Sequence, residues 1–253
     1  MGQHISHSQI GKMLSCARQY QYSYIDKLDS LWGYPFLLGQ SYHAAIERNF
    51  RAKLNTGEDL AVEDCVAAFE SYWNSELGSR EWNWKDQKPG DIYDHGVGLV
   101  RLYLATTAPF VMPAQVEVPF NIPFPELTGR TLKGRIDLIT DKGVVVDHKT
   151  STKAKSEKMI HKEIQFSAYA AVVLADPALD VVPCAWHTAI YKSKPEIQEL
   201  GTERNRADVA WYLALCEQVI RQIDSGIFPP NPTSMFCSPD NCGFWDRCKA
   251  GAR

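Results

Sequence analysis

Apolar and polar positions predict a β-hairpin in the middle of the chain. The stretches 132–139 and 144–149 are rich in β-branched and aliphatic residues, and Asp141-Lys142-Gly143 between them is typical of a tight turn. Glycine can adopt the positive φ that such a turn requires. We therefore expect two paired strands here.

Three charged residues interrupt these apolar runs: Asp137, Asp147 and Lys149. Residues two apart in a strand point to the same face, so Asp147 and Lys149 project together, and antiparallel pairing would bring Asp137 to them. Two carboxylates at the edge of an apolar sheet are costly unless Mg²⁺ or Mn²⁺ compensates them. Alternatively these are solvent-facing charges, but the three valines before Asp147 indicate a buried strand.

Helical periodicity flanks the hairpin on both sides. Helices are expected from Ser6 or Ser8 to about 24, and over 38–54, 59–77, 91–107, 157–174 and 208–223. Further strands are expected over 115–120, ended by Pro119 and later prolines, and over 184–191. This mixture predicts an α/β protein, with 50–110 as a helical insertion before the sheet.

Composition excludes some classes of protein. The 253 residues are 45% hydrophobic and 23% charged, as in ordinary globular proteins, and the net charge of -3 excludes a wholly basic nucleic-acid binder. We see no apolar run long enough to span a membrane and no secretory signal at the polar N-terminus. We therefore expect a cytoplasmic protein without membrane contacts.

Cysteines cluster near the end of the chain. Cys237, Cys242 and Cys248 fall within twelve residues of a proline-rich, loop-like tail. Exposed cysteines in a reducing compartment indicate a metal site, and Cys16 is the candidate for a fourth ligand. Spacing alone does not separate zinc from an iron–sulfur cluster. The remaining cysteines have apolar surroundings and are expected to pack in the core: Cys65, Cys184 and Cys216.

An ordered set of motifs resembles a known family. The set is Gly134-Arg-Ile-Asp137, then Asp147-His148-Lys149, then Gln165-Phe-Ser-Ala-Tyr169. It is similar to the PD-(D/E)XK nuclease superfamily, and in particular to its RecB-like branch, which adds the Gln-x-x-x-Tyr motif. An isolated Asp-x-Lys is unspecific, whereas the ordered set is far more specific. The resemblance implies an α/β, restriction-endonuclease-like central mixed β-sheet flanked by helices, with an N-terminal helical lobe and a cysteine-cluster tail.

The four cysteines resemble the iron–sulfur subgroup of this branch, which includes AddB-type helicase-nucleases and nucleases of CRISPR adaptation. Cys16-Ala17-Arg-Gln-Tyr is similar to their Cys-Pro-x-x-Tyr element, with Ala17 in place of proline. The resemblance implies a structural [4Fe–4S] cluster on Cys16, Cys237, Cys242 and Cys248, with Zn²⁺ as the alternative. It also implies three regions: a helical region (1–110), a nuclease core (111–228) and a cysteine cluster (229–253).

The resemblance assigns roles to single residues. His43, Asp137, Asp147 and the backbone carbonyl of His148 would hold Mg²⁺ or Mn²⁺. Lys149 would orient the attacking water or stabilise the developing charge, with Gln165 and Tyr169 positioning the water, the lysine or the phosphate. Two acidic residues are candidates for supporting the site: Glu47 and Glu117. Four basic residues are candidates for contacting DNA phosphates: Arg130, Lys133, Arg135 and Lys153.

The resemblance favours metal-dependent hydrolysis of DNA, with exonuclease action on single-stranded or free-ended substrates. The resemblance places such an enzyme in a bacterium, an archaeon or a phage, in DNA repair, recombination or CRISPR adaptation. A phosphate-binding loop of helicase type is absent from the sequence, so any helicase partner would be a separate chain. The alternatives are a non-catalytic nucleic-acid-binding protein with a structural Zn(Cys)₄ site, and a zinc-dependent scaffold.

Overall fold

The structure is a computed structural model that describes residues 4–30, 32–124, 127 and 129–250. Contacts divide the chain into two compact units. The terminal unit comprises residues 1–31, 120–134 and 207–253, and the sheet unit comprises 32–119 and 135–206. Each unit is assembled from separate stretches, and the boundaries expected after residues 110 and 228 stay predictions.

A mixed β-sheet organises the sheet unit. Its strands are β6 (Val145–Ser151), β7 (Val181–Ile190), β8 (Glu196–Asn205) and the parts of β4 (Pro113–Pro123) and β5 (Thr131–Thr140) that belong to this unit. The order is β5-β6-β7-β8, and β4 pairs with β5. β6 and β7 run parallel, whereas β5–β6 and β7–β8 are antiparallel. The predicted hairpin is confirmed, with Gly143 at φ 75° in its turn.

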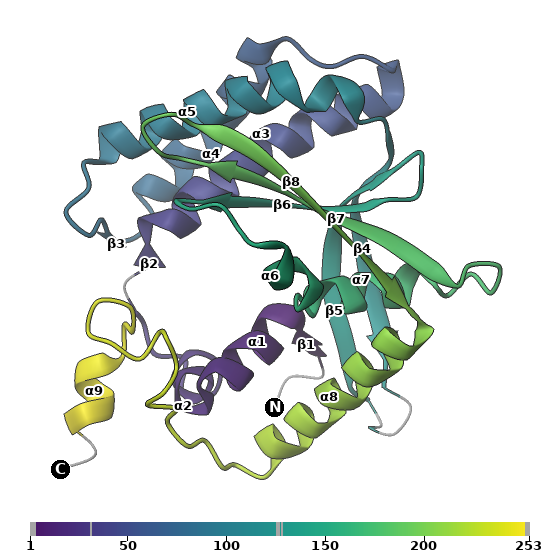
Figure 1. Cartoon of the computed structure of the whole chain (residues 1–253). Coiled ribbons are helices and arrows are strands. Elements are labelled where there is room, and N and C mark those ends of the chain that lie inside the picture. The colour runs from purple at the N-terminus through teal and green to yellow at the C-terminus, as the bar shows by residue number, and fades with distance from the viewer. Residues whose placement is uncertain (1–3, 31, 125–126, 128, 251–253) are drawn as a thin grey trace. The chain divides into compact units, whose positions relative to one another are not determined.

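Helices cover this sheet. They are α3 (Tyr34–Thr56), α4 (Val62–Leu77), α5 (Pro89–Thr106), α6 (Glu157–His161), α7 (Gln165–Val173) and the 3₁₀ turn η2 (Ala108–Phe110), with the short strands β2 (Trp32–Gly33) and β3 (Trp82–Asn83) beside them. Helices α3, α4 and α5 lie together in Figure 1 and share one buried core with Leu138, Val146 and Ala189 of the sheet. Helix α7 contacts β7 and β8. The α/β fold class is confirmed.

The terminal unit contains both ends of the chain. Its elements are β1 (His4–Ser6), α1 (His7–Ser15), α2 (Ala17–Tyr20), the π-helical turn η1 (Gln21–Ile25), α8 (Arg206–Asp224, from residue 207 on) and α9 (Trp245–Ala250). Strand β1 pairs in parallel with 131–133. Ser6 and Gln9 form a reciprocal capping box that fixes the start of α1.

The first predicted helix is wrong in one respect: it breaks at Cys16, which the sequence placed inside it. Cys16 is extended, with φ -163° and ψ 108°. Asn231, far along the chain, makes the break tolerable because its side-chain amide donates to the Ser15 carbonyl at 3.0 Å. The tail is not all loop either, since α9 carries Cys248.

The predicted helix over 157–174 is likewise two helices, α6 and α7. The buried Arg204 guanidinium donates to the carbonyls of Ile160, His161 and Glu163 at 3.2, 3.1 and 2.8 Å. These bonds satisfy backbone acceptors that a break in the helix leaves open.

Strand predictions also need two corrections. Strand β8, which carries Arg204, was not predicted. Pro119 does not end β4, which runs on to Pro123. Of the ladder partners described, β4 pairs with β5 alone, and an edge strand tolerates a residue without an N–H.

A buried polar contact crosses the core of the sheet unit. The Tyr103 hydroxyl lies 3.0 Å from His148 Nε2 and 2.8 Å from His187 Nδ1. Burial lowers the pKa of both imidazoles, that of His187 to about 3, so both rings are neutral at physiological pH. One hydroxyl can then donate to one ring and accept from the other.

We predict that Tyr103→Phe lowers the free energy of unfolding by about 1–3 kcal/mol, because two buried ring nitrogens lose their partner. Tyr42→Phe is the matched control. Tyr42 is fully buried with its ring centre 6.2 Å from that of Tyr103, and its hydroxyl has no hydrogen-bond partner among the described residues. That control should be neutral or stabilising. Urea denaturation measures both changes, and equal losses would contradict the prediction.

Candidate active site

The candidate site lies where β5 and β6 separate. The described ladder between them pairs Leu138 with Val146 and Ile139 with Val145. One step further, the Asp137 carboxylate accepts a hydrogen bond from the His148 N–H at 2.9 Å. The side chain of Asp137 thus takes the place of a backbone acceptor, which holds its carboxylate beside β6.

Asp147 and Lys149 project together from β6, as the period of a strand predicts. Lys149 Nζ lies 2.7 Å from Asp147 Oδ2, and Asp147 is 1% exposed. Despite that short distance, Oδ2 makes no hydrogen bond of normal geometry within the described residues. A buried carboxylate oxygen in this state has coordination capacity to spare.

Two residues of α7 close a ring of hydrogen bonds around this pair. Gln165 Oε1 accepts from Lys149 Nζ at 3.1 Å, and Gln165 Nε2 donates to the Tyr169 hydroxyl. That hydroxyl donates to Asp147 Oδ1 at 3.3 Å. The ring fixes the ammonium and the carboxylate against each other, which a long lysine side chain alone would not achieve.

The pKa values of the two carboxyl groups are pushed apart. Burial alone would raise the pKa of Asp137, but the neighbouring His43, His148 and Lys149 outweigh it and hold the pKa below its usual range. Burial raises the pKa of Asp147, and repulsion from Asp137 adds to this, so that the attraction of Lys149 does not compensate.

The Lys149 pKa is raised although burial would lower it, because several carboxylates surround the ammonium. The raised pKa of Lys149 favours its charged form, whereas the raised pKa of Asp147 disfavours its charged form. The two are compatible because the lysine has more than one acidic neighbour, whereas Asp147 has one cation and a like charge beside it.

Helix α3 brings His43 to the same place. Its Nδ1 lies 3.5 Å from Asp137 Oδ2. A Cβ on Gly39, one turn earlier, would meet Thr150 Oγ1 of β6 at 3.3 Å, so glycine permits the close approach of α3 to β6. Glu47, one turn after His43, forms an exposed pair with Arg51 at 2.6 Å.

Glu117 reaches toward this site from β4. Its backbone has φ 54°, which is a strained conformation for a residue with a Cβ. Burial raises its pKa, and Asp137 raises it further, while Arg135 Nη1 binds its Oε2 at 3.1 Å. Glu117 therefore belongs to the electrostatic surroundings of Asp137.

The four basic residues expected to contact DNA are divided between the two units. Arg130 and Lys133 belong to the terminal unit, and Arg135 and Lys153 to the sheet unit. Both arginines are paired, Arg130 with Asp224 and Arg135 with Glu117. The two lysines are exposed.

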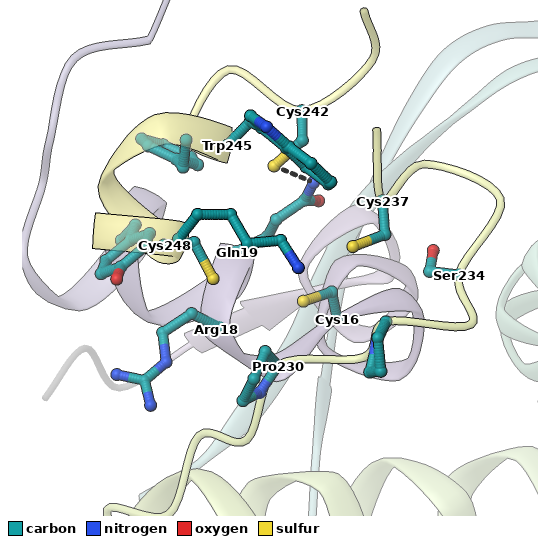
Figure 2. Close-up of a pocket in the computed structure, with 13 residues that line it drawn as sticks. Cys16, Arg18, Gln19, Pro230, Ser234, Cys237, Cys242, Trp245 and Cys248 are labelled. Atoms are coloured by element: carbon teal, nitrogen blue, oxygen red, sulfur yellow. Dashed lines mark hydrogen bonds between the residues drawn. The ribbon is translucent and has the colours of Figure 1, made fainter. Parts of the chain in front are cut away.

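All four candidate cluster cysteines line one cavity of about 120 Å³ in the terminal unit. Figure 2 shows the sulfur atoms of Cys16, Cys237, Cys242 and Cys248 directed into it. Gln19 Nε2 donates to Cys242 Sγ at 3.1 Å, and the Asn231 N–H donates to Cys16 Sγ at 3.4 Å. Among the residues described, no three His, Cys, Asp or Glu side chains already converge as a metal-binding group.

The sequence motifs missed Tyr103 and His187. His187 stands opposite His148 in the parallel register of β6 and β7. A histidine inside an apolar strand could have been noticed in the sequence. The pairing of β6 with β7 could not, because no local pattern specifies which strands become neighbours.

A family model described as the PD-(D/E)XK nuclease superfamily matches residues 4–249. The chain belongs to this superfamily. Its members are nucleases, so membership supports a nuclease that acts on DNA. No functionally curated protein matches the chain at significant similarity. Every helix among the described residues is too short or too polar to cross a membrane.

Two solved structures resemble this PD-(D/E)XK chain. A "Putative exonuclease" from Eubacterium rectale matches with a TM-score of 0.61 and 11% identity, covering 93% of this chain and 87% of its own. It confirms the restriction-endonuclease-like fold. SSO0001 matches with a TM-score of 0.39 and 17% identity, covering 96% and 89%, which is too distant for an inference.

We predict that Asp147→Asn raises the melting temperature of the protein at neutral pH in EDTA. An acid whose pKa is raised by folding stabilises the folded state at low pH, and this stabilisation is lost as the pH rises through the folded-state pKa. The amide of asparagine carries no charge, so the variant does not lose this stability at neutral pH. Each kcal/mol of stability gained raises the melting temperature by about 2–4 °C.

Asp141→Asn, in the exposed hairpin turn, is the control and should leave the melting temperature and its pH dependence nearly unchanged. Melting curves at several pH values measure both variants. A lower melting temperature for Asp147→Asn at neutral pH would show that the ionised carboxylate stabilises the metal-free fold.

Proposed function

We propose that this PD-(D/E)XK protein is a Mg²⁺- or Mn²⁺-dependent deoxyribonuclease that acts as an exonuclease on single-stranded or free-ended DNA. One observation carries the proposal: a buried carboxylate oxygen of Asp147 that makes no normal hydrogen bond, inside a ring that also fixes Lys149. The alternative, a non-catalytic binding protein, has no need of such an arrangement beside phosphate.

The donor set fits a hard divalent cation. Asp137 and Asp147 supply carboxylate oxygens, His43 an imidazole close to Asp137, and His148 a backbone carbonyl. We assign these four residues as the ligands. Held by these residues, Mg²⁺ or Mn²⁺ would supply a more acidic coordinated water and would offset charge on the phosphate.

The other side chains supply position and fixed charge. Lys149, held by Asp147 and Gln165, presents an ammonium that stabilises negative charge on the attacked phosphate or orients the attacking water. Tyr169 and Gln165 keep that ammonium in place, so little reorganisation is needed during the reaction. Glu117 and Glu47 add negative potential near the site, and we propose them as supporting residues.

Exonuclease action is supported by the name of the Eubacterium rectale protein, whose fold this chain shares. Exposed Lys133 and Lys153 are proposed phosphate contacts, with Arg130 and Arg135 available once their carboxylate partners are displaced. The proposal extends to a cytoplasmic role in DNA repair, recombination or CRISPR adaptation.

We also propose a structural [4Fe–4S] cluster on the four cysteines. The support for this cluster is the shared cavity and the two N–H donors aimed at sulfur atoms, since an N–H group that bonds to a sulfur orients it as a metal ligand. Such a cluster would join α1, α2 and the tail within the terminal unit, and its binding free energy would become folding free energy.

Lys149→Ala and Asp147→Asn should each reduce the rate of DNA cleavage by about a hundredfold or more, because the first removes the ammonium that stabilises charge on the phosphate and the second removes a carboxylate ligand of the proposed metal. Cleavage is followed on strands labelled at either end, and on circular single strands, with Mg²⁺, Mn²⁺ or EDTA. Cleavage of the linear strands without cleavage of the circular ones would support exonuclease action.

Lys142→Ala is the matched control, since Lys142 is an exposed lysine in the turn of the same hairpin. It should cleave at the wild-type rate, and circular dichroism should show all variants folded. Undiminished metal-dependent cleavage by Lys149→Ala would remove the site assignment, and retention of DNA without any product would favour the binding protein.

For the cluster, Cys248→Ala should lose iron and acid-labile sulfide after anaerobic purification, and should lower the melting temperature. Cys216→Ala is the control, because Cys216 is buried in α8 and burial raises its pKa to about 11, which keeps it a thiol. This variant should keep its iron. Stoichiometric zinc without sulfide in the wild type would replace the cluster by a Zn(Cys)₄ site.

A further inference from the structure

Two large aromatic side chains stand exposed at the start of α3. Trp32 and Phe36 are each 41% exposed, and their ring centres lie 4.4 Å apart in an edge-to-face contact. We call this pair the Trp32–Phe36 platform. Both residues belong to the sheet unit, which also contains His43, Asp137 and Asp147. Neighbouring exposed aromatics are costly in water, so they commonly mark a binding surface.

The platform is held by its surroundings. Strand β2 pairs with β3, which places Trp32 beside Trp82 (Figure 1 shows both strands near the start of α3). The Arg80 guanidinium lies 5.1 Å from the Trp32 ring centre and 5.7 Å from that of Trp82. Glu76 in turn binds Arg80 at 3.3 Å. The exposed indole is therefore presented in a fixed orientation.

Phe36, the residue of the platform that belongs to α3, lies on the same face of this helix as His43. Phe36, Gln40, His43 and Glu47 follow one another at spacings of four, three and four residues, which is the repeat of one helix face. His43 follows Phe36 by seven residues, so the two lie ~10.5 Å apart along the helix axis. A single continuous helix thus fixes the separation between the exposed rings and the imidazole that contacts Asp137.

We propose that the Trp32–Phe36 platform stacks a base of single-stranded DNA within about three nucleotides of the cleaved phosphate, since stacked bases rise ~3.4 Å each. This rests on the proposed nuclease function and names how its substrate is held. The Arg80 guanidinium, which lies over the Trp32 ring, supplies positive charge beside the stacked base for its phosphate.

The size and chemistry of the platform favour this occupant over a protein partner. Two side chains exposed to this extent offer roughly 200 Å² of aromatic surface, whereas a stable protein interface needs about 800 Å² on each side. One nucleobase needs a flat aromatic surface and a nearby positive charge, and no more.

The test is the affinity for a fluorescently labelled oligodeoxythymidine, measured by anisotropy in EDTA so that neither metal nor cleavage is required. Trp32→Ala and Phe36→Ala should each weaken binding at least about fivefold. Phe110→Ala is the matched control, since Phe110 is 85% exposed in the same unit but lies in η2, outside the platform. It should bind as the wild type does.

A scan with single abasic nucleotides locates the stacked base. The wild type should lose affinity at one position near the cleaved linkage, and the Phe36→Ala variant should respond equally weakly at every position. Phe36→Leu keeps an apolar side chain and should still lose the positional response, which separates stacking from a folding defect. Trp32→Phe should restore much of the affinity.

The two proposals fail separately. Normal cleavage by the wild type, together with wild-type binding by Trp32→Ala and Phe36→Ala, would overturn the platform and leave the nuclease; the exposed pair would then be assigned to a protein partner. Weakened binding and a lost positional response, in a protein that cleaves nothing, would support the platform and remove the catalytic assignment.

Discussion

The candidate site depends on the ion pair between Asp147 and Lys149. Both charges sit on a strand whose neighbours are buried, and burying an ion is expensive unless a partner and hydrogen bonds compensate it. Here the compensation is a closed ring in which Gln165 and Tyr169 connect the ammonium to the carboxylate. The ring therefore fixes the carboxylate and the ammonium in one arrangement.

The ring of hydrogen bonds does not satisfy every acceptor of Asp147, and this determines what the site can bind. Asp147 keeps an oxygen without a normal hydrogen bond, and its pKa is raised, while Asp137 nearby is held in its charged form. Two carboxyl groups this close repel each other, and the cation of the proposed function would relieve that repulsion. The two neighbouring carboxyl groups lower the stability of the folded protein, which is a common cost of a binding site.

Helix α3 connects several requirements in one rigid element. One side of it is buried with α4, α5 and the sheet, and the other presents His43 to Asp137. Gly39 allows the close approach to β6, and the exposed ring of Phe36 near the N-terminal end lies on the His43 face. Tyr103 packs against Tyr42 and Phe50 of α3 in the same core and bridges two neutral imidazoles, one of them His148 of the strand that carries Asp147 and Lys149.

Local pattern in the sequence determined the hairpin, the shared direction of Asp147 and Lys149, and the one-turn spacing of Gln165 and Tyr169. Each follows from the period of a strand or a helix, which acts over a few residues. The break at Cys16, the break between α6 and α7, and the bridge from Tyr103 to His148 and His187 were decided by tertiary structure. Asn231, Arg204 and the pairing of β6 with β7 create them, and such partners come from distant parts of the chain, which no short-range pattern specifies.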